Sequence, residues 1–536
     1  MGRNKAYLLL GIIIVAAFFR FWQLDTTPPG LYPDEAMNGI NALQAINNVD
    51  FKVFYPENNG REGLFINLQA LSVQIFGTTP WALRAVSAAV GTLTVLFFFF
   101  MMQELLALIR PHLHAHTKLF SYFKNEYFSY IAAFLLATTA WHVHFSRIGF
   151  RAIMVSFFLS LAILFLLRGI RTTKLNHYIY SGIFWGLGFY TYIGFRLAPV
   201  LGLAIFIIHV LIWRHQKHGS FVKFLTPYIA LGIAVIITML PLLGYFAGHR
   251  DDFGARSGGI SVFAAENPVL AFLESTAKTL IMFNIAGDWN WRHNFAGSPQ
   301  LIYGVGAFFL LGVVLLIKDS AIAFLRKHDP HLFIPKAVVG GWFFATMLPA
   351  ILTNEGLPHA LRSIGMIPPT VIFATIGIVW AWDFWRTATG ANMRLASGLL
   401  GLVLAAIAVG NWHHYFIVWA HDPNVEGAFR QDLMDMSRVL NAQGLEATKY
   451  VIVNEDGVLL DGIPVQSATL RFLTKDDPAI RYMRTPDAST IRVATGESAV
   501  IMLTNPDDTG LNEQIQKMFP QAEKLCGDAQ YFFIRN

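Results

Sequence analysis

The sequence lacks the cysteines that a disulfide framework needs. Cys526 is the only cysteine among 536 residues, so no disulfide forms within one chain and a cysteine-based metal site is excluded. Charged residues are also scarce, at 14% of the chain, whereas a soluble protein carries roughly 25%. Because 54% of the residues are hydrophobic, this deficit predicts an integral membrane protein. The net charge of +6 is explained first by basic cytoplasmic loops, so it does not indicate a nucleic-acid partner.

Long apolar segments recur from residue 6 to about residue 416. A transmembrane helix needs roughly 20 residues, and on this criterion we expect about eleven spans. They lie near 6–22, 82–102, 127–141, 152–168, 177–193, 197–213, 225–246, 300–317, 337–353, 363–383 and 395–416. The first of them has no small-residue cleavage site after it, so we expect an uncleaved signal anchor. The sequence therefore predicts a polytopic α-helical protein of the cytoplasmic membrane.

Basic residues concentrate in alternate loops, for example at Arg168, Arg171 and Lys174. The positive-inside rule places such loops in the cytoplasm, and the N-terminus with them. An odd number of spans then puts the segment after residue 420 outside. That segment has the composition of a small soluble α/β domain, with a helix expected at 424–444 and strands at 450–453, 498–503 and 531–534. We therefore predict a membrane domain at 1–418 and an extracytoplasmic domain at 419–536.

Two long loops are expected on the outer side, at about 23–81 and 247–299. In the first, Pro33 is suited to start a helix, and an apolar stripe follows at spacings of three and four. The apolar stretch 64–76 is too short to span, so we expect it to lie along the interface. The second loop is rich in Gly, Asn and Trp, and loops of this length are usually functional or disordered.

An acidic pair, Asp34 and Glu35, opens the helix expected in the first outer loop. A carboxylate at this place can act as a general base that takes the proton of an attacking hydroxyl. Neighbouring residues of a helix point about 100° apart, so only one of the pair should face the reacting atoms. The alternative is that both acids complement the helix dipole.

Arginines are frequent on the expected outer side, where positive charge is normally thinned out. They are Arg20, Arg61, Arg84, Arg147, Arg151, Arg196, Arg256, Arg292 and Arg362. A guanidinium donates two parallel hydrogen bonds to a phosphate, so the set favours an anionic ligand. The alternative is that each arginine snorkels to lipid headgroups or pairs with a local acid. Arg147 and Arg151 share a helix face if their helix begins by Ser146.

Four histidines also fall on the expected outer side: His142, His144, His293 and His359. With Glu35, Glu57, Glu62 or Glu355 they offer ligands for zinc or another divalent ion. No pair has a diagnostic metal spacing, so we assign no metal ligands. A divalent ion stays an open alternative, and hydrogen-bonded interfacial histidines are the default.

Several motifs of the first 415 residues resemble those of one family. They are Pro33-Asp34-Glu35-Ala36, Asn58-Asn59-Gly60-Arg61-Glu62-Gly63-Leu64-Phe65, Trp81-Ala82-Leu83-Arg84, Ser146-Arg147-Ile148-Gly149-Phe150-Arg151, Tyr190-Thr191-Tyr192, Arg196-Leu197-Ala198-Pro199, His359-Ala360-Leu361-Arg362 and Pro368-Pro369. In order and placement the chain resembles the GT-C fold glycosyltransferases that use polyprenyl-phosphate sugars. The branch with protein O-mannosyltransferases and lipid A aminoarabinose transferases is the most similar. Two departures from the family pattern are Arg61 in place of lysine and Gly63 where relatives often have proline.

The resemblance implies that Asp34 is the general base, with Glu35 beside it. It also implies that the donor phosphate is approached by a set of basic residues, to which we add three members of the arginine set. The predicted donor-phosphate residues are Arg61, Arg147, Arg151, Arg196, Arg292, His359 and Arg362. The implied partners are a polyprenyl-phosphate sugar, an extracytoplasmic acceptor (protein, lipid or glycan) and membrane lipids, with no required cofactor.

The sequence thus predicts a membrane glycosyltransferase that transfers one sugar with inversion. The alternative is a transporter or flippase of an anionic lipid-linked substrate. Transporters place polar sites near mid-membrane and often show paired halves, whereas here the polar residues concentrate at one face. A third alternative is a non-catalytic anchor for the C-terminal domain.

Overall fold

The computed structural model describes residues 2–113, 119–216, 219–326, 329–442, 447–527 and 529–535, without the side chains of 255–258 and 303. The side chain of Arg256 therefore lies outside the described residues, as does Gly444, the predicted end of a helix. The chain divides into two compact units. Unit 1 comprises Met1–Trp22 and Ser87–Trp419, and unit 2 comprises Gln23–Val86 and Ala420–Asn536. The domain boundary at 418/419 stays a prediction.

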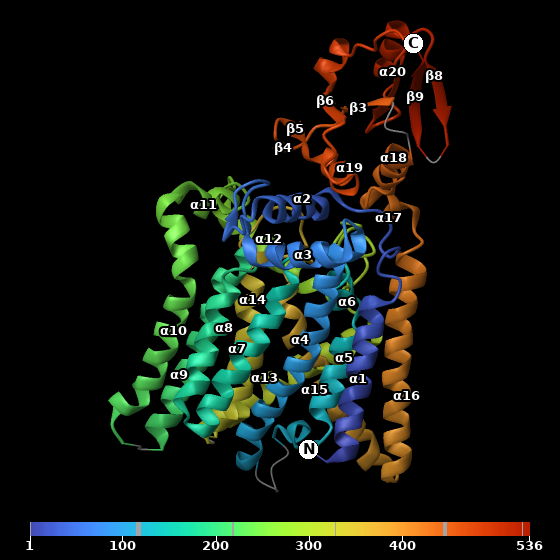
Figure 1. Cartoon of the computed structure of the whole chain (residues 1–536). Helices are drawn as coiled ribbons and strands as arrows, with labels where there is room; N and C mark the ends of the chain where they lie inside the picture. The colour runs from blue at the N-terminus through green and yellow to red at the C-terminus, as the bar shows by residue number, and fades with distance from the viewer. Residues whose placement is uncertain are drawn as a thin grey trace. The chain divides into compact units, whose positions relative to one another are not determined.

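Unit 1 is a bundle of long helices (Figure 1). Its main helices are α1 (Arg3–Phe21), α4 (Pro80–Ile109, which begins in unit 2), α5 (Phe128–Thr138), α7 (Ile153–Thr172), α8 (Leu175–Gly188), α9 (Pro199–His215), α10 (Phe221–Gly248), α13 (Tyr303–Leu325), α14 (Gly341–Ile351), α15 (Ile367–Thr389) and α16 (Met393–Trp412). Each predicted span coincides with one of them. Among the described residues, nine helices are long and apolar enough to cross a membrane. The other two predicted spans, α5 and α8, have 11 and 14 residues. The multi-pass helical fold is confirmed, and its orientation stays a prediction.

Glycines allow close contact between α13 and α15. A Cβ on Gly312 would lie 1.8 Å from the carbonyl oxygen of Phe373, and one on Gly377 would lie 2.1 Å from that of Phe308. Small residues permit such backbone approach between membrane helices, where lipid gives no hydrophobic driving force. The crossing holds α13 against a helix that is buried along most of its length.

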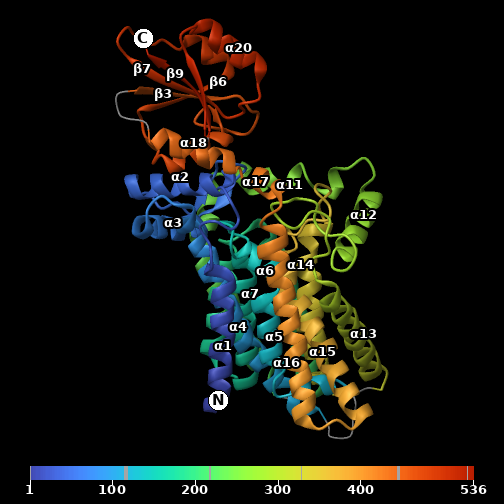
Figure 2. The same cartoon turned by 90° about the vertical axis from the view of Figure 1, so that its right-hand side faces the viewer.

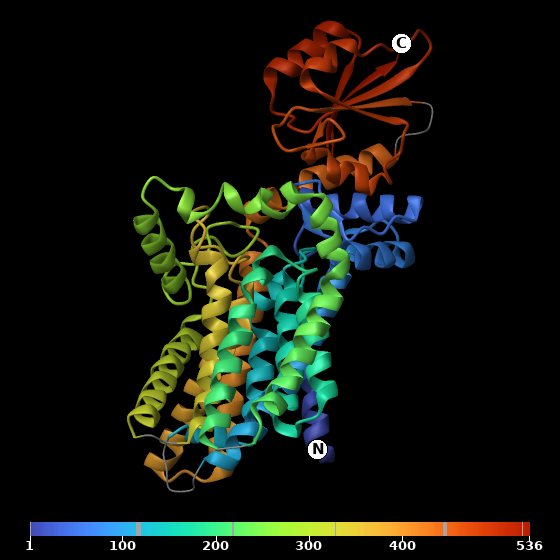
Figure 3. The same cartoon turned by 90° about the vertical axis from the view of Figure 1, so that its left-hand side faces the viewer.

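Short helices connect the spans at the end of the bundle opposite the start of α1 (Figure 1, Figure 2 and Figure 3). They include α6 (Ala140–Phe145), η3 (Ile193–Leu197), α11 (Arg250–Gly258), η4 (Val262–Ala264), α12 (Pro268–Ile281), η7 (Ile364–Met366) and the π-helix η8 (His413–Trp419). The expectation that Arg147 and Arg151 share a helix face is wrong. Helix α6 ends at Phe145 and α7 begins only at Ile153, so both arginines lie in the turns between the two helices.

Unit 2 combines the first outer loop with the C-terminal segment. The loop forms α2 (Pro33–Asn48), a small hairpin of β1 (Phe54–Tyr55) and β2 (Arg61–Glu62), and α3 (Gly63–Phe76). The predicted helix after Pro33 is therefore confirmed. Its apolar stripe is buried in a cluster that includes Ala36, Ile40 and, from α19 (Ala468–Leu473), Phe472. The two parts of unit 2 thus share a hydrophobic core.

The C-terminal part is built on a five-stranded sheet of order β6-β3-β7-β9-β8. Its strands are β3 (Ala447–Val453), β6 (Ile480–Arg484), β7 (Ser498–Leu503), β8 (Glu523–Cys526) and β9 (Gln530–Arg535). Strand β3 is parallel to β6 and β7, whereas β9 is antiparallel to β7 and β8. The three predicted strands are confirmed as β3, β7 and β9. Strands β6 and β8 at the two edges were missed because charged residues interrupt their short apolar stretches.

The helix predicted over 424–444 is interrupted. Helix α17 (Pro423–Ala428) ends before Arg430, which has a φ of 57°, and α18 (Gln431–Ala442) follows. A positive φ is outside the right-handed helical region, so the chain must turn there. Helix α18 packs on one side of the sheet and α20 (Thr509–Met518) on the other, so β3 and β7 bury side chains on both sides.

Candidate active site

The acidic pair lies in the first turn of α2, and its two side chains have different environments. Glu35 is fully buried and forms an ion pair with Arg84, with Nε 3.1 Å from Oε2 and Nη2 3.3 Å from Oε1. Arg84 also donates to the carbonyl oxygens of Pro28 (2.7 Å) and Gly30 (2.8 Å). Glu35 therefore holds the arginine that fixes the chain leading into the helix.

Asp34 is only half-buried. Its Oδ1 accepts a hydrogen bond of 2.8 Å from the amide of Asn58. The structure thus separates the pair as helix geometry requires, with one carboxylate committed to an internal ion pair and the other reachable from outside.

Arg61 lies along the same side of α2. Its guanidinium donates to Asn38 Oδ1 (2.8 Å) and to Asn41 Oδ1, and its Nε donates to the carbonyl oxygen of Glu57 (3.3 Å). Asn38 and Asn41 lie four and seven positions after Asp34, so all three project from one helix face. Arg61 is 2% exposed, and its charge is therefore fixed beside this face rather than mobile in solvent.

A second polar cluster, in unit 1, is centred on Asp288 in the loop between α12 and α13. Asp288 Oδ2 accepts the backbone N–H of Ala360 (2.8 Å) and lies 3.0 Å from His293 Nδ1 and 3.9 Å from His359 Nδ1. Its Oδ1 accepts the N–H of Asn290 (2.8 Å). These three side chains place one ligand atom each within 4.8 Å of one another, so the cluster could hold a metal ion. Two of the four predicted histidines are brought together, with an aspartate that the sequence analysis did not select.

Arg362 continues this cluster on the segment before α15. It donates to Thr353 Oγ1 (2.9 Å) and to the carbonyl oxygen (2.7 Å) and carboxylate (3.2 Å) of Glu355. The backbone N–H of Arg362 donates to His359 Nδ1 (3.4 Å). The predicted pair His359 and Arg362 is therefore joined locally, and Glu355 pairs with the arginine.

Arg292 and His144 meet at a backbone group of the same loop. His144 Nε2 lies 2.5 Å from the carbonyl oxygen of Arg292, whose own Nε donates to Asn290 Oδ1 (3.2 Å). Burial lowers the pKa of His144 from 6.5 to about 3, so its ring is neutral and donates Nε2–H. The ring thereby anchors the loop that carries Asp288, Asn290 and His293.

The remaining predicted arginines contact aromatic rings. Arg147 is fully buried, 4.8 Å from the ring of Phe416, and donates to the carbonyl oxygen of Phe19 (3.1 Å). Arg151 and Arg196 are half-buried, at 5.7 Å and 4.4 Å from the rings of Tyr192 and Phe253. Stacking on an aromatic face leaves the edge of a guanidinium able to donate hydrogen bonds.

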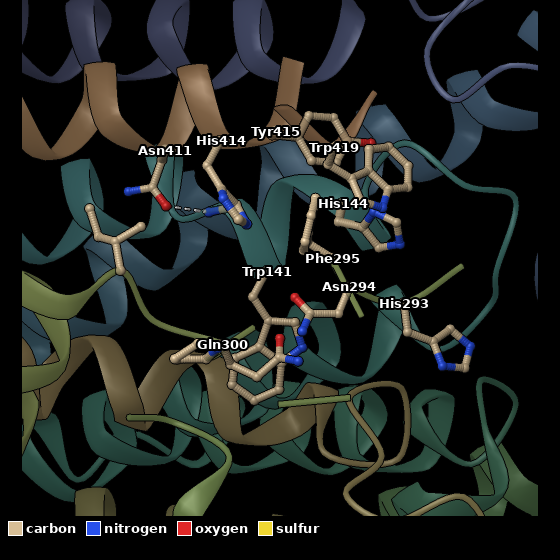
Figure 4. Close-up of a pocket in the computed structure, with 13 residues that line it drawn as sticks. Trp141, His144, His293, Asn294, Phe295, Gln300, Asn411, His414, Tyr415 and Trp419 are labelled. Atoms are coloured by element: carbon tan, nitrogen blue, oxygen red, sulfur yellow. Dashed lines mark hydrogen bonds between the residues drawn. The ribbon is translucent and has the colours of Figure 1, made fainter. Parts of the chain in front are cut away.

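A small pocket opens beside this loop (Figure 4). Its lining residues are Ala140, Trp141, His144, His293, Asn294, Phe295, Pro299, Gln300, Ile302, Asn411, His414, Tyr415 and Trp419. Aromatic walls with a few amides and imidazoles are typical of a site for a small polar molecule. The amide nitrogen of Gln300, a residue that is 6% exposed, has no hydrogen-bond partner among the residues that the structure describes. A buried unpaired amide costs free energy, so a ligand that accepts its hydrogen bond would be stabilised here.

Comparison with known proteins identifies the architecture. Residues 117–245 match the family model for dolichyl-phosphate-mannose-protein mannosyltransferases. Two solved structures of ArnT from Cupriavidus metallidurans, bound to undecaprenyl phosphate and in the apo state, superpose with TM-scores of 0.55 and 0.56. The superpositions cover 98% and 99% of this chain and 97% and 98% of ArnT, at 13% and 12% identity. The predicted GT-C fold is confirmed. The apo oligosaccharyltransferase of Archaeoglobus fulgidus shares this GT-C fold at a TM-score of 0.50 and 11% identity, over 90% of this chain and 65% of that one.

No curated protein sequence matches the chain. The recognition from sequence motifs and the enzyme class agree with the family model and with the GT-C fold. The role of each site residue stays a prediction.

The buried neutral state of His144 predicts an acid-sensitive fold. Between pH 6.5 and about 3 the unfolded chain takes up a proton on this ring and the folded chain does not, so stability falls as the pH decreases. At pH 5 this costs about 2 kcal/mol, because one pKa unit corresponds to about 1.4 kcal/mol. In His144→Gln, the difference between the free energies of unfolding at pH 7 and pH 5 should shrink by that amount. Equal differences in both proteins would contradict the assignment.

Proposed function

We propose that the protein is an inverting glycosyltransferase. It would transfer one sugar from an undecaprenyl- or dolichyl-type phosphate carrier to a hydroxyl of a protein, lipid or glycan outside the cytoplasm. The family model over residues 117–245 and the GT-C fold support the donor class. The observation that carries the chemical assignment is the separation of the acidic pair, in which Glu35 is bound to Arg84 and Asp34 is reachable.

Asp34 takes the acceptor proton in this mechanism. The acceptor oxygen attacks the anomeric carbon while its O–H proton passes to the carboxylate of Asp34, and the bond between that carbon and the phosphate oxygen breaks. The polyprenyl phosphate leaves with the electron pair, and attack from the opposite face inverts the configuration. A general base must be within hydrogen-bond reach of the proton it takes. The hydrogen bond from Asn58 holds the carboxylate of Asp34 in one position, which favours such a geometry.

Basic residues stabilise the departing phosphate. We assign this role to Arg61, Arg151, Arg196, Arg292, His359 and Arg362. Fixed cations lower the barrier because negative charge develops on the leaving oxygen. Arg147, which is fully buried against Phe416, is assigned instead to positioning η8.

The aromatic pocket suits the sugar itself. The indoles of Trp141 and Trp419 line it, and the amide of Gln300 offers a hydrogen bond to a hydroxyl group. The amides of Asn294 and Asn411 also line it and already bond the backbone. The unpaired nitrogen of Gln300 is the strongest indication of a ligand hydrogen bond.

Gln300→Met should raise the KM for the lipid donor by roughly 2- to 12-fold with little change in kcat, because one neutral hydrogen bond is worth about 0.5–1.5 kcal/mol. Methionine keeps the shape of the side chain and removes its donors. Gln103→Met is the matched control: this amide bonds Ser129 Oγ elsewhere in the bundle, and its loss should leave KM unchanged. An unaltered KM in Gln300→Met would remove the pocket from the proposal.

The reaction class is tested with purified protein in vesicles that contain a radiolabelled polyprenyl-phosphate sugar. Incorporation of label into an acceptor supports transfer. Movement of the intact labelled lipid across the bilayer, without incorporation, would instead support a flippase. Mass spectrometry of envelope glycans, lipids and proteins with and without the protein identifies the acceptor.

A further inference from the structure

A cluster of two histidines and one aspartate lies at the other end of the unit 1 bundle. His112 ends η1 (Arg110–His112), which follows α4, while Asp329 and His331 lie at the start of η5 (Pro330–Phe333), after α13. His112 Nδ1 lies 2.7 Å from Asp329 Oδ2, and His331 Nδ1 lies 2.7 Å from Asp329 Oδ1. One carboxylate thus receives two imidazoles from different connections of the bundle.

The rings of the two histidines are stacked in parallel. Their centroids are 3.7 Å apart, with an interplanar angle of 6°. Both Nδ1 atoms therefore point the same way, toward the carboxylate. One ligand atom from each of the three residues lies within 4.8 Å of the other two, so the three side chains could hold a metal ion.

We propose that His112, Asp329 and His331 form a zinc site that joins the end of α4 to the connection between α13 and α14. Two imidazole nitrogens and one carboxylate oxygen are ligands that Zn²⁺ accepts, with a fourth position left for water. Zinc bonds of about 2.0–2.2 Å in a tetrahedral site separate ligand atoms by roughly 3.3 Å. The Nδ1–oxygen distances of 2.7 Å must therefore open by about 0.6 Å, which side-chain rotation provides.

The surroundings leave these nitrogens open to an ion. With Nδ1 turned to Asp329, His331 Nε2 lies 3.2 Å from Nε2 of Gln216, beyond the end of α9. A metal-bound histidine donates its other N–H to an acceptor, so zinc binding requires the Gln216 amide to turn its oxygen toward His331 Nε2. The three side chains are half-buried, with exposed fractions of 26%, 31% and 13%, so an ion can reach them.

Asp329 is the acidic member of the cluster, and its carboxylate brings the negative charge that a divalent cation favours.

The cluster is separate from the candidate active site. Helix α13, of 23 residues, connects the loop with His293 to the segment before Asp329, and its length is roughly 34 Å. Zinc bound here would not touch the reacting atoms. It would hold the ends of α4 and α13 together.

The test measures zinc bound to the full-length protein in detergent after treatment with a chelator and return of Zn²⁺. His114, His116 and His328 are near the site in sequence, so all proteins carry asparagine at these positions. This parent should bind about one zinc ion more than its variant H112N/D329N/H331N. Zn²⁺ should also raise the unfolding temperature of the parent by a few degrees, and not that of the variant.

A second variant controls for the other cluster. H293Q/H359Q should keep the zinc-dependent rise of the unfolding temperature, because it leaves the proposed site intact. Equal bound zinc and equal temperature shifts in the parent and H112N/D329N/H331N would overturn the proposal.

A measurement without these variants is available if the triple change prevents folding. Bound zinc should protect His112 and His331 of the parent from diethylpyrocarbonate, as read by mass spectrometry, with His249 as the exposed control. Modification of both histidines at the same rate with and without Zn²⁺ would overturn the proposal as well.

Discussion

Asp34→Asn should lower the kcat of sugar transfer by about 10²- to 10⁴-fold, the range that a general base contributes. The amide cannot take a proton from the acceptor hydroxyl. It retains an oxygen that accepts the hydrogen bond from Asn58, so the local structure of α2 should persist. The measurement is the initial rate of incorporation of a labelled sugar by vesicles that contain equal amounts of wild-type and variant protein.

Binding and folding are the controls for this variant. The KM for the lipid donor and the unfolding temperature should stay close to those of the wild type, because the negatively charged Asp34 side chain does not bind the donor phosphate. Asp34→Glu keeps a carboxylate and should recover part of the rate if its longer side chain still reaches the acceptor. Near-normal transfer by Asp34→Asn would remove Asp34 from the role of base.

The membrane fold could be predicted from the sequence because each span is formed by one continuous apolar segment. Hydropathy alone located a helix for every predicted span, even where α5 and α8 are shorter than a bilayer requires. The C-terminal strands β3, β7 and β9 were found for the same reason, since they are apolar runs. Local signals failed where the chain departs from regular structure, as in the turns that carry Arg147 and Arg151.

Contacts between segments that are distant in the chain could not be predicted from the sequence. Nothing near Glu35 indicates that Arg84, 49 positions later, is its partner. Asp288 was missed because its spacing of five from His293 matches no metal motif, and His359 joins the cluster only through the fold. The pairing of the first outer loop with α19 in one hydrophobic core has the same origin.

The second large effect, on stability, is expected from the ion pair between Glu35 and Arg84 inside unit 2. Glu35→Gln removes the charge opposite Arg84, and both side chains of this pair are fully buried. A buried charge that loses its partner destabilises a protein by about 3–5 kcal/mol. The variant should therefore unfold at a much lower denaturant concentration than the wild type. The loss of activity should follow the loss of folded protein, unlike the loss in Asp34→Asn.

A matched control distinguishes the loss of a buried ion pair from the loss of an exposed one. Glu513→Gln breaks the exposed pair with Lys517 in the same unit, and surface pairs contribute little to stability. Replacing both partners, as in Glu35→Leu with Arg84→Met, should recover part of the stability, because no unpaired charge is then buried. Recovery stays incomplete since Arg84 also binds the carbonyl oxygens of Pro28 and Gly30. A Glu35→Gln protein as stable as Glu513→Gln, yet inactive, would instead give Glu35 a direct part in the chemistry.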